Sequence, residues 1–225
     1  MFSIPFLIAF PLALLLPNYV SLSGIFLRPD TIGNQASIEM LALTVGVSLI
    51  AILLYSFSLA AVNVVVKSQR TMVKLKNFDF ELVEEATFRI FGVMLVIFAL
   101  IFTFTLLILR LDPTDSIYSL IARAVFMFVI SLSALFAPQA IVIDRSSIEN
   151  SLSLSYRIVK TKTAFTIGLI AVTFALVGLN TVIFDGLSNY LFFASILGLA
   201  VNALVISPFL EVLKVQIFLS KYTLL

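Results

Sequence analysis

The amino-acid sequence predicts an all-α fold: a polytopic transmembrane helical bundle of six spans, with short amphipathic helices on the cytoplasmic side. First, 61% of its 225 residues are hydrophobic and only 12% are charged. The mean hydropathy of +1.18 is well above what a soluble core requires. Second, uncharged runs cover residues 40–66, 90–109, 124–143 and 163–184. Each is close to the ~20 residues that cross a hydrocarbon layer about 30 Å thick. Third, none of these runs alternates as the strands of a membrane β-barrel do.

The first expected span, residues 3–27, is apolar but contains Pro5, Pro11 and Pro17, each of which would kink a helix. A secretory signal peptide is the alternative, with Ser21 and Ser23 as small residues near a cleavage site. The positively charged start of such a peptide is missing. We therefore expect a retained first helix.

The other five spans are expected at residues 38–66, 88–109, 117–143, 163–184 and 189–219, so that residues 1–225 form a single transmembrane domain. Polar or amphipathic helical segments are expected near residues 71–89 and 146–160. Ser146 followed by Glu149 has the spacing of a capping box, which predicts that the second segment has Ser146 as its N-cap.

Positive charge is unevenly divided between the two sides of this layout. Eleven of the 14 lysines and arginines lie in the second-to-third connection, in the fourth-to-fifth connection, or near the C-terminus. Arg28, Arg110 and Arg123 lie on the opposite side. Because lysine and arginine accumulate on the cytoplasmic side, we expect a multi-pass protein of the cell membrane with both termini in the cytoplasm.

Small side chains recur at helical spacing in two places. Such faces let two helix backbones approach closely. We expect them to pack within the bundle, and the alternative is a groove for a partner helix or a lipid. The first set is Ser147, Ser151 and Ser155, which precede the fifth span. The second set, which we name the small-residue stripe, lies in the fifth span and consists of Ala164, Gly168, Ala171, Ala175 and Gly178.

Two prolines lie late in predicted spans, Pro138 in the fourth and Pro208 in the sixth. Each would free the carbonyl four residues back, and such breaks can line an ion or substrate site. We expect passive kinks, on the premise that no charged residue lies near them in the spans. Glu211 and Lys214 share one helix face and are expected at the inner membrane interface.

Arg123 and Asn202 are the residues at which an intramembrane polar site is expected. Arg123 is a cation inside an apolar run, and such residues often mark substrate or ion pathways. It can instead snorkel to the outer surface, or pair with Asp112, Asp115 or Asp185. A structural ion pair is the interpretation that we favour.

Residue types exclude several chemistries. The chain has no histidine and no cysteine, so a histidine base, a His-Glu-x-x-His metal site and thiolate chemistry are ruled out. Walker and Gly-x-Gly-x-x-Gly motifs are absent, and the aspartates lie in loops or at span ends rather than paired within spans. We expect no enzyme activity, no cofactor and no metal site. No basic patch interleaved with aromatic residues points to nucleic acid.

The central stretch resembles a known family. The residues that carry the resemblance are Pro138, segments 140–144, 148–151 and 155–160, then Pro208 and Tyr222. Their order is similar to that in prokaryotic six-helix membrane proteins of uncertain role, which are related to the membrane domain of some glycerophosphoryl diester phosphodiesterases. The chain departs from the family pattern at positions 151, 152 and 156, and the likeness covers mainly its second half. The resemblance implies a six-helix bundle and no catalytic residues.

Two functions follow from these observations. We favour a non-enzymatic subunit or scaffold of a membrane complex, which would contact membrane lipids and bind other membrane proteins or a second copy of itself. The alternative is a transporter or permease-like module for a small solute or lipid, with its site near Arg123 or Asn202.

Overall fold

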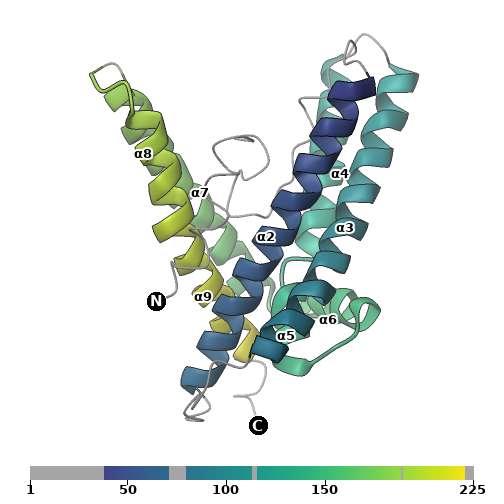
Figure 1. Cartoon of the computed structure of the whole chain (residues 1–225), viewed down its shortest axis with the longest axis vertical. Coiled ribbons are helices and arrows are strands. Elements are labelled where there is room, and N and C mark those ends of the chain that lie inside the picture. The colour runs from purple at the N-terminus through teal and green to yellow at the C-terminus, as the bar shows by residue number, and fades with distance from the viewer. Residues whose placement is uncertain (1–37, 71–79, 113–115, 189, 221–225) are drawn as a thin grey trace.

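The computed structural model describes residues 38–70, 80–112, 116–188 and 190–220, and every regular element within them is a helix (Figure 1). The predicted all-α class is therefore confirmed. The expected first span, residues 3–27, lies outside the described residues. The helices are α2 (Ile38–Arg70), α3 (Phe80–Leu111), α4 (Ile117–Ser133), α5 (Ala137–Asp144), α6 (Ile148–Thr161), α7 (Thr163–Ser188), α8 (Ala194–Val201), the π-helix η1 (Asn202–Ile206) and α9 (Ser207–Leu219).

Four helical stretches are long and apolar enough to cross a membrane. They are Glu81–Ile108, Ile117–Asp144, Thr163–Ser188 and Ile196–Leu219, and they overlap the last four predicted spans, with bounds that differ by up to seven residues. Within α2, a shorter apolar stretch covers Ile52–Ser68. The described helices are thus compatible with insertion into a membrane.

The helices form a V in which two arms meet at a common base (Figure 1). In one arm, α3 packs against both α2 and α4. In the other, α7 packs against α8. At the base, α9 contacts α2 and α5, and α6 contacts α7, so the short helices join the two arms.

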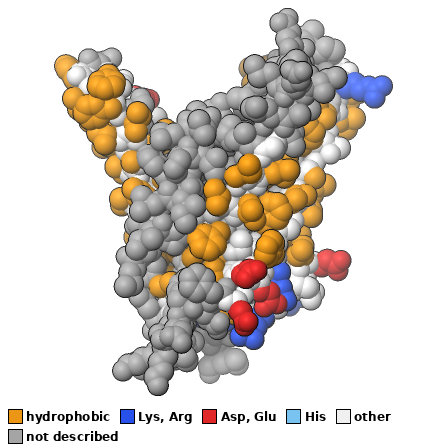
Figure 2. Space-filling view, in the orientation of Figure 1, with side chains coloured by type: hydrophobic (Ala, Val, Ile, Leu, Met, Phe, Trp, Pro, Cys, Tyr) orange, Lys and Arg blue, Asp and Glu red, His pale blue; other side chains and the backbone are white. Residues whose placement is uncertain are grey.

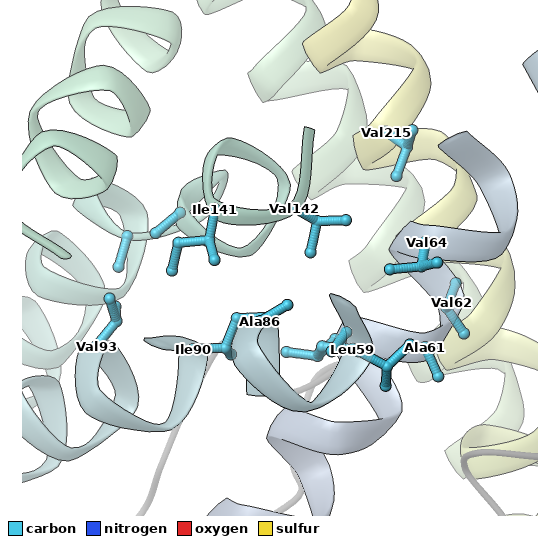
Figure 3. Close-up of a cluster of buried hydrophobic side chains, with 14 of the residues drawn as sticks. Leu59, Ala61, Val62, Val64, Ala86, Ile90, Val93, Ile141, Val142 and Val215 are labelled. Atoms are coloured by element: carbon cyan, nitrogen blue, oxygen red, sulfur yellow. The ribbon is translucent and has the colours of Figure 1, made fainter. Parts of the chain in front are cut away.

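Buried apolar side chains hold the base together. In Figure 3, Leu59 of α2, Ile90 of α3 and Ile141 of α5 belong to one cluster of buried side chains. Val215 of α9 belongs to the same cluster. A second cluster includes Phe218 of α9 together with side chains from α5, α6 and α7. Helix α9 therefore contributes to both clusters, which ties one arm to the other.

The predicted fourth span is broken at residues 134–136, just before Pro138, and continues as α5. The carbonyl of Ala134, which the proline frees, accepts a hydrogen bond from the amide of Ala137 at 3.0 Å. The amide of Phe136 donates to the Ser155 hydroxyl of α6 at 2.9 Å. The Ala134 carbonyl and the Phe136 amide thus both keep hydrogen-bond partners at the break. Backbone groups in apolar surroundings need such partners, because no water is available to them.

The connection between α5 and α6 corrects the predicted capping box. The N-cap of α6 is Ser147 rather than Ser146, and its hydroxyl accepts from the amide of Asn150 at 3.5 Å. Arg145 ends α5 in the left-handed conformation, with φ of 53°. The amides of Arg145 and Ser146 both donate to the carbonyl of Ala140, that of Ser146 at 3.4 Å. The backbone of Ser146 takes part in the end of α5, and the next residue, Ser147, is the N-cap of α6.

The second arm is shaped by a π-helix and a glycine. In η1, which precedes Pro208, the amide of Ser207 donates to the carbonyl of Asn202, five residues back. Gly198 of α8 lies so close to α7 that a Cβ atom there would be 2.9 Å from the Cβ of Phe184. Asn180 of α7 donates to the Gly198 carbonyl at 2.9 Å, which links the two helices.

Ser155→Ala should lower the free energy of unfolding by about 1–3 kcal/mol, because it leaves the buried amide of Phe136 without its acceptor. Ser153→Ala is the matched control, since Ser153 is exposed on the same helix. Denaturant unfolding of the purified protein in detergent micelles measures both values. Equal losses for the two variants would contradict the role given to Ser155.

Candidate functional site

A buried polar cluster lies where α5 and α9 meet at the base. It consists of Gln139 on α5 with Glu211 and Lys214 on α9, whose side chains are almost completely buried. The amide nitrogen Nε2 of Gln139 donates to Oε2 of Glu211 at 2.9 Å. The ammonium group of Lys214 forms an ion pair with Oε1 of the same carboxylate. One carboxylate therefore binds one side chain through each of its oxygens.

Helix α2 completes the surroundings of this cluster. Tyr55 of α2 is close enough to Glu211 for the two to interact electrostatically. Among the described residues, Oε1 of Gln139 is buried and has no hydrogen-bond partner. The cluster thus combines a neutralised charge pair with one unused acceptor at the junction of three helices.

The local sequence explains why the ion pair is buried. Glu211 and Lys214 are three residues apart, so both point from the same face of α9. The apolar residues Leu210, Val215 and Phe218 of α9 are fully buried as well. Removing two charges from water costs several kcal/mol each, and this cost is offset only where the charges pair closely and keep hydrogen bonds. The contact with Gln139 supplies the additional hydrogen bond.

These contacts bear on two predictions. Glu211 and Lys214 are predicted at the inner membrane interface; the structure buries both side chains between helices, and their depth in a membrane stays a prediction. The kinks at Pro138 and Pro208 are predicted to be passive on the premise that no charged residue lies near them, and that premise is wrong. Gln139 directly follows Pro138, and the Glu211 carboxylate lies three residues after Pro208. The signal in the sequence was the Glu-Lys spacing within an apolar helix, but nothing in it indicated the partner on α5.

A second polar arrangement caps the end of α5. The ammonium group of Lys67, at the end of α2, donates to the carbonyls of Val142 at 2.8 Å and Ile143 at 3.0 Å. A cation here satisfies carbonyls that have no partner within the helix and opposes the negative end of its dipole. Lys67 follows the predicted second span. Its partial burial, and then the charge of Arg145, lower its pKa.

Charged groups from separate connections meet at this end of the molecule. Arg89 of α3 donates to the carbonyl of Arg145 at 3.3 Å and forms an ion pair with Glu85 at 2.5 Å. Figure 2 shows a broad band of hydrophobic side chains, with acidic and basic side chains gathered below it at the base. Lys67, Arg89 and Arg145 belong to the two connections that share one side in the predicted layout.

The predicted polar site at Arg123 and Asn202 is not brought together. Arg123 is buried on α4, where its Nε donates to the carbonyl of Ser119 at 3.4 Å. Helix α4 packs against α3 and α6, whereas Asn202 begins η1, which packs against α7, α8 and α9. The two residues therefore belong to different arms (Figure 1). The pairing of Arg123 with an aspartate stays a prediction.

The two sets of small residues have different surroundings. On α6, Ser151 and Ser155 are fully buried, and Ser147 is the exposed N-cap. On α7, all five residues of the small-residue stripe are exposed. A Cβ atom added at Gly168 or Gly178 would have no neighbour within 4 Å. The serine face therefore packs internally, and the small-residue stripe remains open.

A groove of about 430 Å³ runs beside the first turns of α7. Its other wall is the end of α9, so it lies on the outside of the base. We name it the α7–α9 groove, and its lining consists of Ala164, Phe165, Gly168, Leu169, Val172, Leu213, Gln216, Ile217 and Ser220.

Together, the apolar helices and the buried ion pair are those of a helical protein suited to a membrane. The chain has no significant match among family models, curated proteins or solved structures. The resemblance to the membrane domain of glycerophosphoryl diester phosphodiesterases therefore stays a prediction.

Glu211→Gln should lower the free energy of unfolding by about 3–5 kcal/mol, because it leaves the buried ammonium of Lys214 without a counter-charge. Adding Lys214→Met should recover most of this loss, since no charge then remains in the cluster. Unfolding in detergent micelles is the measurement.

The control is Glu85→Gln, which breaks the exposed ion pair with Arg89 and should cost less than about 1 kcal/mol. If Glu211→Gln costs no more than this control, or if the double variant recovers nothing, the carboxylate does not act as a buried charge.

Proposed function

We propose that the chain is a non-enzymatic multi-pass membrane protein that serves as a subunit or scaffold of a membrane complex. In this proposal it crosses the cell membrane six times, with both termini in the cytoplasm and α6 at the inner surface. The partners are other membrane proteins or a second copy of the chain. The observation that carries the proposal is the open small-residue stripe on α7.

Helix α7 differs from the other candidate spans in how little of it is covered. In its most apolar stretch, only 11% of the residues are buried. In the corresponding stretches of the other three candidate spans, 33% to 39% are buried. Its buried residues, Thr166, Leu169 and Thr173, form one narrow face. The opposite side of the helix carries the small-residue stripe beside large exposed apolar side chains such as Phe174 and Leu179.

The stripe suits a second helix better than it suits lipid tails alone. In a membrane, helices gain little from hydrophobic burial and associate mainly through close packing, to which small residues contribute most. Gly168 and Gly178 leave open space where a partner backbone can approach. This surface supports binding of a helix from another membrane protein or another copy of the chain.

A transporter is the second candidate, and the buried cluster favours it. Ionisable residues inside membrane spans are costly and often belong to substrate or ion pathways, and broken helices often line such sites. Glu211 and Lys214 follow Pro208 on α9, and Gln139, which binds Glu211, follows Pro138 on α5. The subunit function is preferred because these charges already neutralise each other and are almost completely buried.

The proposed orientation can be tested with single cysteines, because the chain has none of its own. Ser153 is exposed on α6 at the base, and Tyr190 is exposed between α7 and α8. In intact cells, a membrane-impermeant maleimide should label Tyr190→Cys and leave Ser153→Cys unlabelled until the cells are opened. The reverse pattern would overturn the proposed orientation.

Gly178→Leu should abolish partner binding, because the larger side chain prevents close helix approach at the small-residue stripe. Gly186→Leu is the control, since Gly186 is also exposed on α7 with open space around it but lies beyond the stripe. Gentle-detergent purification followed by mass spectrometry measures the stoichiometry of co-purifying chains. A wild-type protein that elutes as a lone monomer, or equal effects of the two variants, would contradict the subunit proposal.

A further inference from the structure

The α7–α9 groove is apolar along most of its length and polar at one end. Leu169 and Val172 line it from α7, and Leu213 and Ile217 line it from α9. Its polar residues are Gln216, near the end of α9, and Ser220, the C-cap of that helix. Its volume of about 430 Å³ is within the range of small-ligand sites. The groove is therefore suited to an elongated molecule with one polar end.

Positive charge lies at the same end of the groove. Lys162 is the single residue between α6 and α7, and its ammonium group is 6.0 Å from the ring centre of Phe165, which lines the groove. Arg157 and Lys160, both exposed on the last turns of α6, add to the charge. A ligand held here would have a negatively charged head.

The position of the groove along α7 determines the direction in which a bound ligand would point. Its lining on α7 extends from Ala164 to Val172, which is about 12 Å of helix. That is close to the thickness of one leaflet of hydrocarbon, about 15 Å. The groove begins at the first turn of α7, beside the charged base, so an acyl chain in it would point toward the middle of a bilayer.

We propose that the α7–α9 groove binds an anionic phospholipid, with one acyl chain along Gly168 and Val172 and the phosphate against Lys162. Gly168 provides the room, because a Cβ atom there would have no neighbour within 4 Å. The lipid uses only the first two residues of the small-residue stripe. Ala171, Ala175 and Gly178 remain available to a partner helix. Lipid binding thus goes beyond the proposed subunit function and does not require it.

Native mass spectrometry of the full chain can test this in micelles with equal amounts of phosphatidylglycerol and phosphatidylcholine. The wild-type protein should retain phosphatidylglycerol in preference. Lys162→Gln should reduce that preference about fivefold, the effect of losing one basic residue at an anionic surface. Gly168→Leu should abolish retention of both lipids, because its side chain fills the groove. Gly178→Leu, outside the groove, should retain lipid as the wild type does.

Equal retention of the two lipids by the wild-type protein would show ordinary contact with bulk lipid and would overturn the proposal. Equal retention by Gly168→Leu and Gly178→Leu would overturn it as well. The lipid measurement is made on the chain alone, so it is separate from the test of partner binding. If Gly178→Leu keeps its lipid and has no effect on co-purifying chains, the subunit function fails and the lipid site stands.

Discussion

The base of the V depends on how one buried carboxylate is neutralised. Glu211 accepts a hydrogen bond from Gln139 and pairs with Lys214, so that α9 is linked to α5 through a charge. Separating α5 from α9 would leave the amide of Gln139 and one oxygen of the Glu211 carboxylate without a hydrogen-bond partner, at a cost of about 1–3 kcal/mol. The apolar clusters around α9 pack in the same region, and Val215 lies in one of them. The hydrogen bond from Gln139 to Glu211 and the apolar packing therefore fix the same junction.

The need for hydrogen-bond partners also determines how each break in the helices is built. Where Pro138 interrupts the predicted fourth span, the Ser155 hydroxyl accepts a hydrogen bond from the amide of Phe136, and at the end of α5 Lys67 donates to two carbonyls. Before Pro208, the π-helix provides hydrogen bonds of wider spacing. These partners come from other helices or from a locally altered helix, because lipid offers backbone groups nothing to bind. The breaks are thus possible only within this arrangement of neighbours.

The two arms differ in how much of their apolar surface is buried. Helices α2, α3 and α5 bury much of their apolar surface against one another, whereas α7 is covered mainly along the face of Leu169 and Thr173. Its remaining surface carries both the small-residue stripe and one wall of the α7–α9 groove. A partner helix and a lipid would therefore occupy adjacent parts of one helix. This places the external contacts of the molecule away from the buried ion pair.

Composition and the length of the apolar runs determined the helical class and the four helical stretches that are long and apolar enough to cross a membrane, because that length, about 20 apolar residues, does not depend on their partners. The sequence also indicated the break at Pro138. It could not show that Gln139 binds Glu211, since the two are 72 residues apart. Nor could it show which small-residue set is covered, because Ser155 and Gly168 satisfy the same spacing rule. Only the tertiary structure decided these points, since burial depends on which helices become neighbours rather than on the pattern within any one of them.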